Sequence, residues 1–179
     1  MFNTVWFPLF LVAAGAVVAL AAALARGSAS SPSTLSAPSG TRDYQEEYTS
    51  PDFGDTAGFA ITSYPSNDIL IPGRFWLING RTAEIEYNIV PNNFARLRVA
   101  EDGNLDIPDA FTDNEHESAT TYPVGDIEVT QSQSPGRRSM LQWRKGEFEY
   151  VLLSEEPEMN VLGGVSTDFV TQTEANKTS

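Results

Sequence analysis

The chain contains no cysteine and a single histidine, His116, among its 179 residues. Without a thiol it can form no disulfide, no cysteine-ligated zinc site and no lipid-modified cysteine anchor. A multi-histidine metal site is excluded, and a Ser-His-Asp triad would depend on His116. We therefore expect a protein that is not an enzyme and that needs no cofactor.

Basic residues are also scarce, with 11 Lys and Arg against 24 Asp and Glu and a net charge of -13. Attraction to a polyphosphate needs a basic surface, so the composition excludes nucleic acid as a general partner. The length fits about one domain.

Charged side chains are absent from residues 1–25. Val5 to Leu24 form an uninterrupted run of about 20 apolar residues, roughly 30 Å as a helix, which matches a bilayer core. The run has no polar face of the kind that a soluble helix shows. It predicts a single transmembrane helix at residues 1–26. The alternative is a signal segment cleaved near Ala23-Leu24-Ala25, which would release a secreted domain.

Small residues give this segment a possible second role. Gly15 and Ala19 lie on one helical face at the spacing by which transmembrane helices approach each other. They could contact another membrane protein, or belong to a lone alanine-rich anchor. Arg26 and Arg42 follow the segment and weakly favour a cytoplasmic domain.

The remaining chain divides by composition. Residues 27–50 are rich in Ser, Pro and Gly and then acidic, so we expect a flexible linker. Residues 51–170 are long enough to close one core. The polar residues 171–179 predict a disordered tail.

Period-two alternation dominates the predicted domain. Ala83 to Ile89 alternate cleanly and place Tyr87 on the apolar face of a strand. Asn79-Gly80 predicts a hairpin turn, and Lys145-Gly146 predicts a second one. Trp143 lies in a strand beside that second turn, and we expect it in the core with Tyr87.

Helix signals are few. Asp52 to Gly58 predict one or two turns closed by the glycine. Ser154 can cap a C-terminal helix that Gly163-Gly164 should interrupt. The fold class is therefore α+β, with a curved antiparallel sheet of about six strands and one or two short helices.

Several segments of the domain follow one another in a familiar order. They are Gly58-Phe59-Ala60-Ile61, Ala83 to Tyr87, Leu97 to Ala100 with Asp106-Ile107, Gly125 to Val129, and Leu141 to Tyr150. In this order, residues 52–153 resemble the bacterial domain-of-unknown-function family four-three-six-seven. That family occurs in membrane-anchored proteins, lipoproteins and some anti-sigma factors. The resemblance implies an extracytoplasmic binding or structural domain, and it implies no catalytic residues.

Two features depart from that family's pattern. Ile107 to Phe111 stand where the family has Ile-Ser-Gly and an aromatic residue, and the C-terminal helix contains Pro157 and Gly163-Gly164.

The densest acidic segment runs from Glu101 to Glu117 and contains seven acids. Such a loop could offer oxygen ligands to calcium, but the spacing is not that of an EF-hand. We expect a solvated acidic loop, and a pH-sensing role for His116 is the alternative reading of that histidine. The calcium candidates are Asp106, Asp109, Asp113 and Glu115.

Two arginines are the other candidate ligand contacts. Arg96 and Arg98 share a strand face with Phe94, and Glu84 and Glu86 share a face of the preceding strand. Cross-strand ion pairs are the simpler interpretation. An anion site built on the two arginines is the alternative.

The sequence as a whole predicts a non-enzymatic, membrane-anchored, extracytoplasmic domain for binding, sensing or scaffolding. One alternative is a carrier that holds an apolar ligand in the concavity of the sheet. Another is an accessory subunit of a membrane protein complex, held through the N-terminal helix.

Overall fold

The computed structural model describes residues 45–112, 118–134, 138–154 and 159–179. In these ranges the chain forms ten strands and three helices. The strands are β1 (Gln45–Tyr48), β2 (Phe59–Ser63), β3 (Leu70–Ile78), β4 (Thr82–Ile89), β5 (Asn93–Glu101), β6 (Ser118–Val124), β7 (Ile127–Ser134), β8 (Arg138–Lys145), β9 (Phe148–Ser154) and β10 (Glu174–Lys177). The helices are α1 (Gly54–Ala57), α2 (Asp109–Thr112) and α3 (Met159–Gln172).

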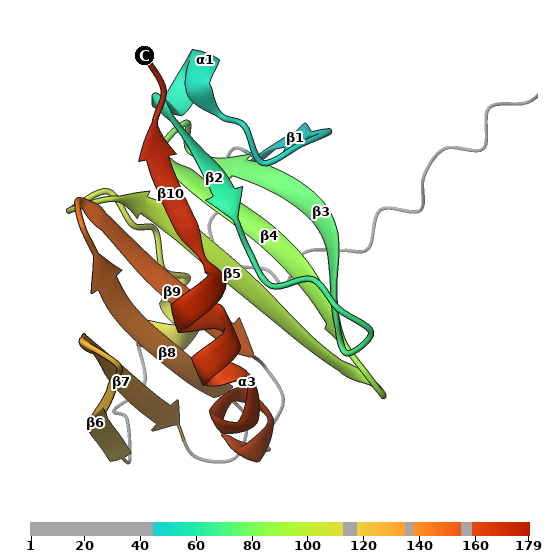
Figure 1. Cartoon of the computed structure of the whole chain (residues 1–179), viewed down its shortest axis with the longest axis vertical. Coiled ribbons are helices and arrows are strands. Elements are labelled where there is room, and N and C mark those ends of the chain that lie inside the picture. Colours follow the sequence, from blue (N-terminus) through green and yellow to red (C-terminus); the bar gives the residue numbers. More distant parts are fainter. Residues whose placement is uncertain (1–44, 113–117, 135–137, 155–158) are drawn as a thin grey trace, which may run out of the picture. The chain divides into compact units, whose positions relative to one another are not determined.

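Eight strands form one antiparallel sheet in the order β1-β3-β4-β5-β9-β8-β7-β6, and β10 pairs with β2 in a small second sheet (Figure 1). The predicted α+β class with a mainly antiparallel sheet is confirmed. The prediction of about six strands is wrong. The strands missed were β1, β2, β6 and β10. β1 and β10 are short and polar, β2 has only three apolar residues, and β6 is mostly exposed, so none shows a clear alternation.

Both predicted hairpin turns are present. Asn79 and Gly80 have φ angles of 52° and 69° between β3 and β4, the left-handed values that this dipeptide tolerates. Gly146, with φ of 63°, begins the turn between β8 and β9. Gly58 closes α1 in the left-handed conformation, as the sequence predicts.

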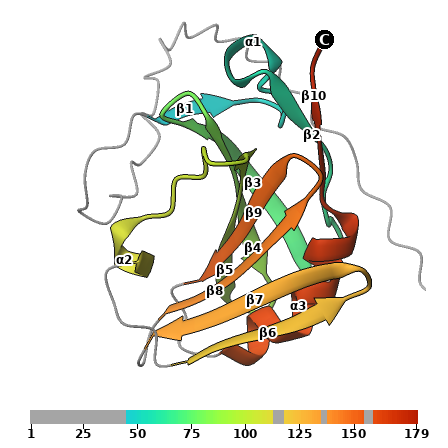
Figure 2. The same cartoon turned by 90° about the vertical axis from the view of Figure 1, so that its left-hand side faces the viewer.

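The main core lies on the face of the sheet that α3, β2 and β10 cover, which we call the inner face (Figure 2). Tyr87 and Trp143 are both buried there, so the predicted core positions are confirmed. The ring of Tyr87 meets Phe169 of α3 edge-on at 4.9 Å. Trp143 stacks on Tyr150 at 5.3 Å between ring centroids.

A second, smaller cluster covers part of the opposite, outer face. It belongs to the strap, our name for residues 102–112, which ends in α2. Phe111 packs with Met140, Val151 and Leu153 of β8 and β9, and Leu105 and Ile107 add partly buried contacts. Figure 2 shows α2 on the side of the sheet away from α3. The antiparallel sheet thus carries the main core on its inner face and a smaller apolar cluster on its outer face.

The ordered structure extends beyond the predicted domain at both ends. β1 falls in the predicted 27–50 linker and pairs with β3. The tail predicted to be disordered from residue 171 instead contains the end of α3 and β10. Ala175 pairs with Ile61 and is buried, because the open edge of β2 satisfies the tail's backbone groups.

Two of the sequence predictions concern helices, one in α3 and one in residues 1–26. Gly163-Gly164 do not interrupt α3, since Leu162, Phe169 and Val170 anchor the helix on the core. No helix among the described residues is long and apolar enough to span a bilayer. The segment 1–26, for which a transmembrane helix is predicted, lies outside the described residues.

Candidate binding surface

Of the predicted cross-strand ion pairs, the one between Glu84 and Arg98 is present and buried. The two residues face each other across β4 and β5, with 2.6 Å between Arg98 Nε and Glu84 Oε2. Their side chains are 2% and 4% exposed, and Arg98 also donates to the carbonyl oxygen of Asp106 in the strap at 2.7 Å. Arg98 therefore holds the strap on the sheet and is shielded from a dissolved anion.

Arg96 has different surroundings. Its guanidinium lies 5.9 Å from the centre of the Phe111 ring, and that of Arg138 lies 5.7 Å from the same ring. Glu86, opposite Arg96 in the register, accepts hydrogen bonds from Arg74 and Trp76 at 2.8 and 3.1 Å. The structure therefore does not present Arg96 and Arg98 side by side to solvent as an anion site.

The calcium candidates are only partly described. Arg81 and Asn79 donate to the carboxylate of Asp106 at 2.7 and 3.0 Å. Partial burial opposes ionisation of this carboxyl, but the hydrogen bonds outweigh burial and hold its pKa below the ordinary value. Asp109 begins α2. Within the described ranges, no three His, Asp or Glu side chains gather closely enough to hold a metal ion.

Several other candidates lie outside the described residues. They are Gly15, Ala19, Asp113, Glu115 and His116.

The distinctive surface feature is a group of exposed large apolar side chains. Ile69, Ile71, Val90 and Phe94 are 44–64% exposed, and they are the large apolar side chains exposed to this degree in the described part of the chain. We call these four residues the outer-face patch.

The strand register brings the four patch residues together at one end of the sheet. Ile71 and Phe94 both pair with Asn88, one from each side, and the Val90 N–H donates to the Ile69 carbonyl oxygen at 2.9 Å. The residues between them in sequence, Leu70 and Ile89, are buried on the inner face. Because neighbours in a strand point to opposite faces, Ile71 and Phe94 lie on the outer face, and Ile69 and Val90 flank them where β3 begins and β4 ends.

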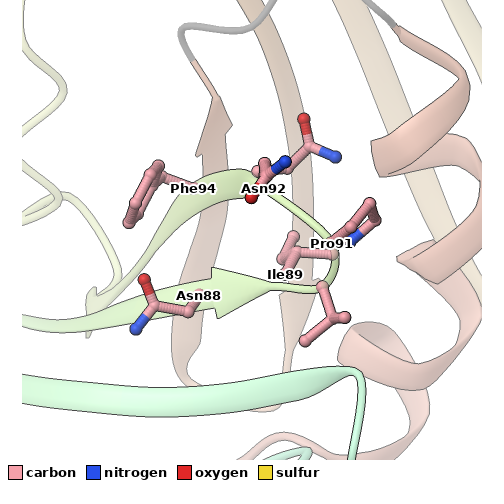
Figure 3. Close-up of a pocket in the computed structure, with 7 residues that line it drawn as sticks. Asn88, Ile89, Pro91, Asn92 and Phe94 are labelled. Carbon is pink, nitrogen blue, oxygen red and sulfur yellow. The ribbon is translucent and has the colours of Figure 1, made fainter.

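The turn between β4 and β5 adds a shallow hollow to the patch. It has a volume of about 220 Å³ and is lined by residues 88–94, including the cis peptide bond between Val90 and Pro91. Figure 3 shows Asn88 and Phe94 on one side of the hairpin and Pro91 on the other.

The segment that carries Ile69 is held firmly. The Asn67 side-chain oxygen accepts from the N–H groups of Ile69 and Leu70, both at 2.8 Å, and the Asn67 N–H donates to the Leu70 carbonyl at 3.0 Å. An apolar surface on a fixed backbone loses little conformational entropy when it is covered.

The patch has an almost neutral surrounding. The segments 67–71 and 88–94 contain four asparagines, and Asp68 is their one charged residue. Apolar and amide side chains can bind another surface, but they supply no nucleophile and no general base.

Sequence reasoning missed this surface. It placed Phe94 on the arginine-bearing face of its strand correctly, yet assigned aromatic residues to the core by default. The signal was the pattern Ile69-Leu70-Ile71, which puts apolar residues on both faces of one strand. Such a pattern shows that one apolar face needs a cover, but not whether the protein itself supplies it.

Comparisons with known proteins add no relative. No family model matches the chain, and no curated protein or solved structure is significantly similar to it.

Proposed function

We propose that this protein is a non-enzymatic, membrane-anchored, extracytoplasmic domain for binding or scaffolding, and that the outer-face patch is its contact surface. The observation that carries the proposal is the gathering of four exposed, bulky apolar side chains at one end of one sheet face. The largest exposed apolar patch of a monomer, typically a few hundred Å², is often a functional contact surface.

Two features of the sequence support the membrane setting. One is the uncharged apolar run from Val5 to Leu24, and the other is the resemblance of residues 52–153 to an extracytoplasmic family. The carrier alternative is less favoured by the packing. The apolar side chains of the inner face are buried under α3, β2 and β10, where an apolar ligand would need an open concavity.

Cysteine accessibility in native membranes tests the proposal. Because the chain has no cysteine, Val90→Cys introduces a single thiol at the patch, and Asp55→Cys introduces one on exposed α1 as a matched control. Whole cells are treated with a membrane-impermeant maleimide, and each rate is normalised to that of the same variant in urea.

We expect rapid labelling of Asp55→Cys, as an extracytoplasmic site requires, and labelling of Val90→Cys at least several-fold slower. Equal normalised rates would show that nothing covers the patch. Labelling of neither variant before the cells are broken would place the domain in the cytoplasm.

A further inference from the structure

We infer that the outer-face patch docks on the surface of the lipid bilayer in which the chain itself is anchored. The inference rests on the proposed function and names the partner of the same surface. Three observations carry it: the size of the patch, the charge around it, and the reach of the N-terminal chain.

The size of the patch favours lipid over protein. Four side chains that are about half exposed offer at most a few hundred Å² of apolar surface. A stable protein interface or dimer buries about 800 Å² on each partner. Shallow insertion into a bilayer needs no complementary partner surface, since each buried apolar group contributes separately.

The charge around the patch fits a bilayer with neutral headgroups. The patch is bordered by Asn67, Asn88, Asn92 and Asn93, whose amides can exchange hydrogen bonds with headgroups and water. Arg74 beside it is already paired with Glu86. The chain as a whole carries -13, so an anionic membrane surface would repel the domain.

The N-terminal chain is long enough to permit this contact. β1 begins at Gln45, opposite Ile78, whereas Ile71 of the patch lies near the other end of β3 (Figure 1). Seven residues of strand separate Ile71 from Ile78, roughly 25 Å. Residues 27–44 reach about 60 Å when extended. An anchored domain can therefore turn its patch to its own bilayer.

Anchoring also makes a weak contact sufficient. A patch of this size would bind a membrane only marginally from solution, as a single short lipid chain does. The anchor converts docking into an intramolecular event at high effective concentration.

The test uses the full chain, purified and reconstituted in phosphatidylcholine vesicles, with an environment-sensitive NBD dye on Val90→Cys or Asp55→Cys. At Val90 we expect blue-shifted emission that nitroxide-labelled lipids quench, and at Asp55 we expect emission typical of water with little quenching. Adding one third of phosphatidylglycerol should reduce the quenching at Val90.

A shortened tether provides a second readout. Deleting residues 28–39 leaves six residues between Arg26 and Gln45, which reach about 20 Å at most. Quenching at Val90 should then be lost, while the protein remains in the membrane after a carbonate wash.

The outcomes separate the two proposals. If the dye at Val90 is exposed to water in vesicles, while the thiol at the same position is shielded in native membranes, the lipid contact is overturned and a protein partner is indicated. If the dye at Val90 is exposed to water in vesicles and the thiol at Val90 is also labelled freely in cells, the proposed function is overturned as well.

Discussion

At the scale of single residues, the buried pair of Glu84 and Arg98 decides how the strap lies. The pair joins β4 to β5, and the remaining donor of Arg98 reaches the strap carbonyl of Asp106. Burying two charges costs about as much free energy as their attraction returns, so such a pair fixes geometry more than it adds stability. Breaking it is different, because one charge would stay buried without a partner.

Arg98→Met should therefore lower the free energy of unfolding by about 3–5 kcal/mol. Arg81→Met is the matched control, because Arg81 also binds Asp106 but is half exposed, and it should lower the free energy of unfolding far less. Urea denaturation measures both. If Arg98→Met is no more damaging than Arg81→Met, the pair is not buried in solution.

Two tyrosines make stability sensitive to alkali. Burial raises the pKa of Tyr87, whose hydroxyl donates to the Pro65 carbonyl. Burial likewise raises the pKa of Tyr150 to about 12, against a partial lowering by the N–H of Ala175. The folded state therefore keeps protons that the unfolded chain releases near pH 10.

Stability should be level up to about pH 9 and fall between about pH 10 and 12, as the unfolded phenols ionise first. Urea midpoints measured across this range test the direction. Tyr87→Phe removes one of the two phenols, so the stability of this variant should fall less over the same pH range. A midpoint that does not change through pH 11, or identical slopes for both proteins, would contradict the burial of these hydroxyls.

At the scale of elements, α3 shows where local preference is overridden. Gly163-Gly164 predict a break, yet the helix continues because Leu162 on one side and Phe169 and Val170 on the other bury apolar area on the core. Both glycines are exposed, and a Cβ built on either meets no neighbour within 4 Å. Their backbone freedom is thus a cost that tertiary packing offsets.

Gly164→Ala should consequently stabilise the protein by about 0.5–1 kcal/mol, by restricting the unfolded chain. Gly80→Ala offers the opposite case, because its φ of 69° belongs to the hairpin turn and an alanine there is strained. Thermal melting should move up for the first variant and down for the second. A downward shift for Gly164→Ala as well would show that α3 is not helical at this position.

The strands and turns also differ in how far they could be predicted from the sequence. The hairpins at Asn79-Gly80 and Gly146 were predicted because their chemistry is local. Cross-strand pairing of the acids in β4 with the arginines in β5 was also predicted, but which partners meet, Glu84 with Arg98, is known only from the structure. β10 and β1 were not predicted, since their polar residues pair only because distant edges of β2 and β3 accept them. The outer-face patch was missed because exposure is a property of the assembled sheet.

At the scale of the whole molecule, charge is the dominant feature. A net charge of -13 on 179 residues favours solubility and opposes compaction through self-repulsion. Ion pairs spread over the surface, such as Arg144 with Asp102 and Lys177 with Glu147, relieve some of it. Dissolved ions should screen the self-repulsion that remains.

Calcium should therefore act on this protein only as a screening ion. Calcium and sodium chloride at equal ionic strength should raise the melting temperature equally, because the screening length is about 10 Å at 0.1 M whichever salt is used. Asp109→Asn should leave that equality intact. A rise specific to calcium, and lost in Asp109→Asn with Asp113→Asn, would instead identify a site in the acidic segment.

The pairing of β10 with β2 has a consequence for the order in which the molecule is made. Residues 59–63 are synthesised long before their partner strand at residues 174–177. Until then the ladder is incomplete, and the bond from the Asn176 amide to the Thr62 hydroxyl has no donor. The meander from β3 to β5 needs only local closures and can form first. The small sheet therefore forms only after β10 has been made, and a nascent chain that has not reached residue 174 leaves the edge of β2 open to other strands.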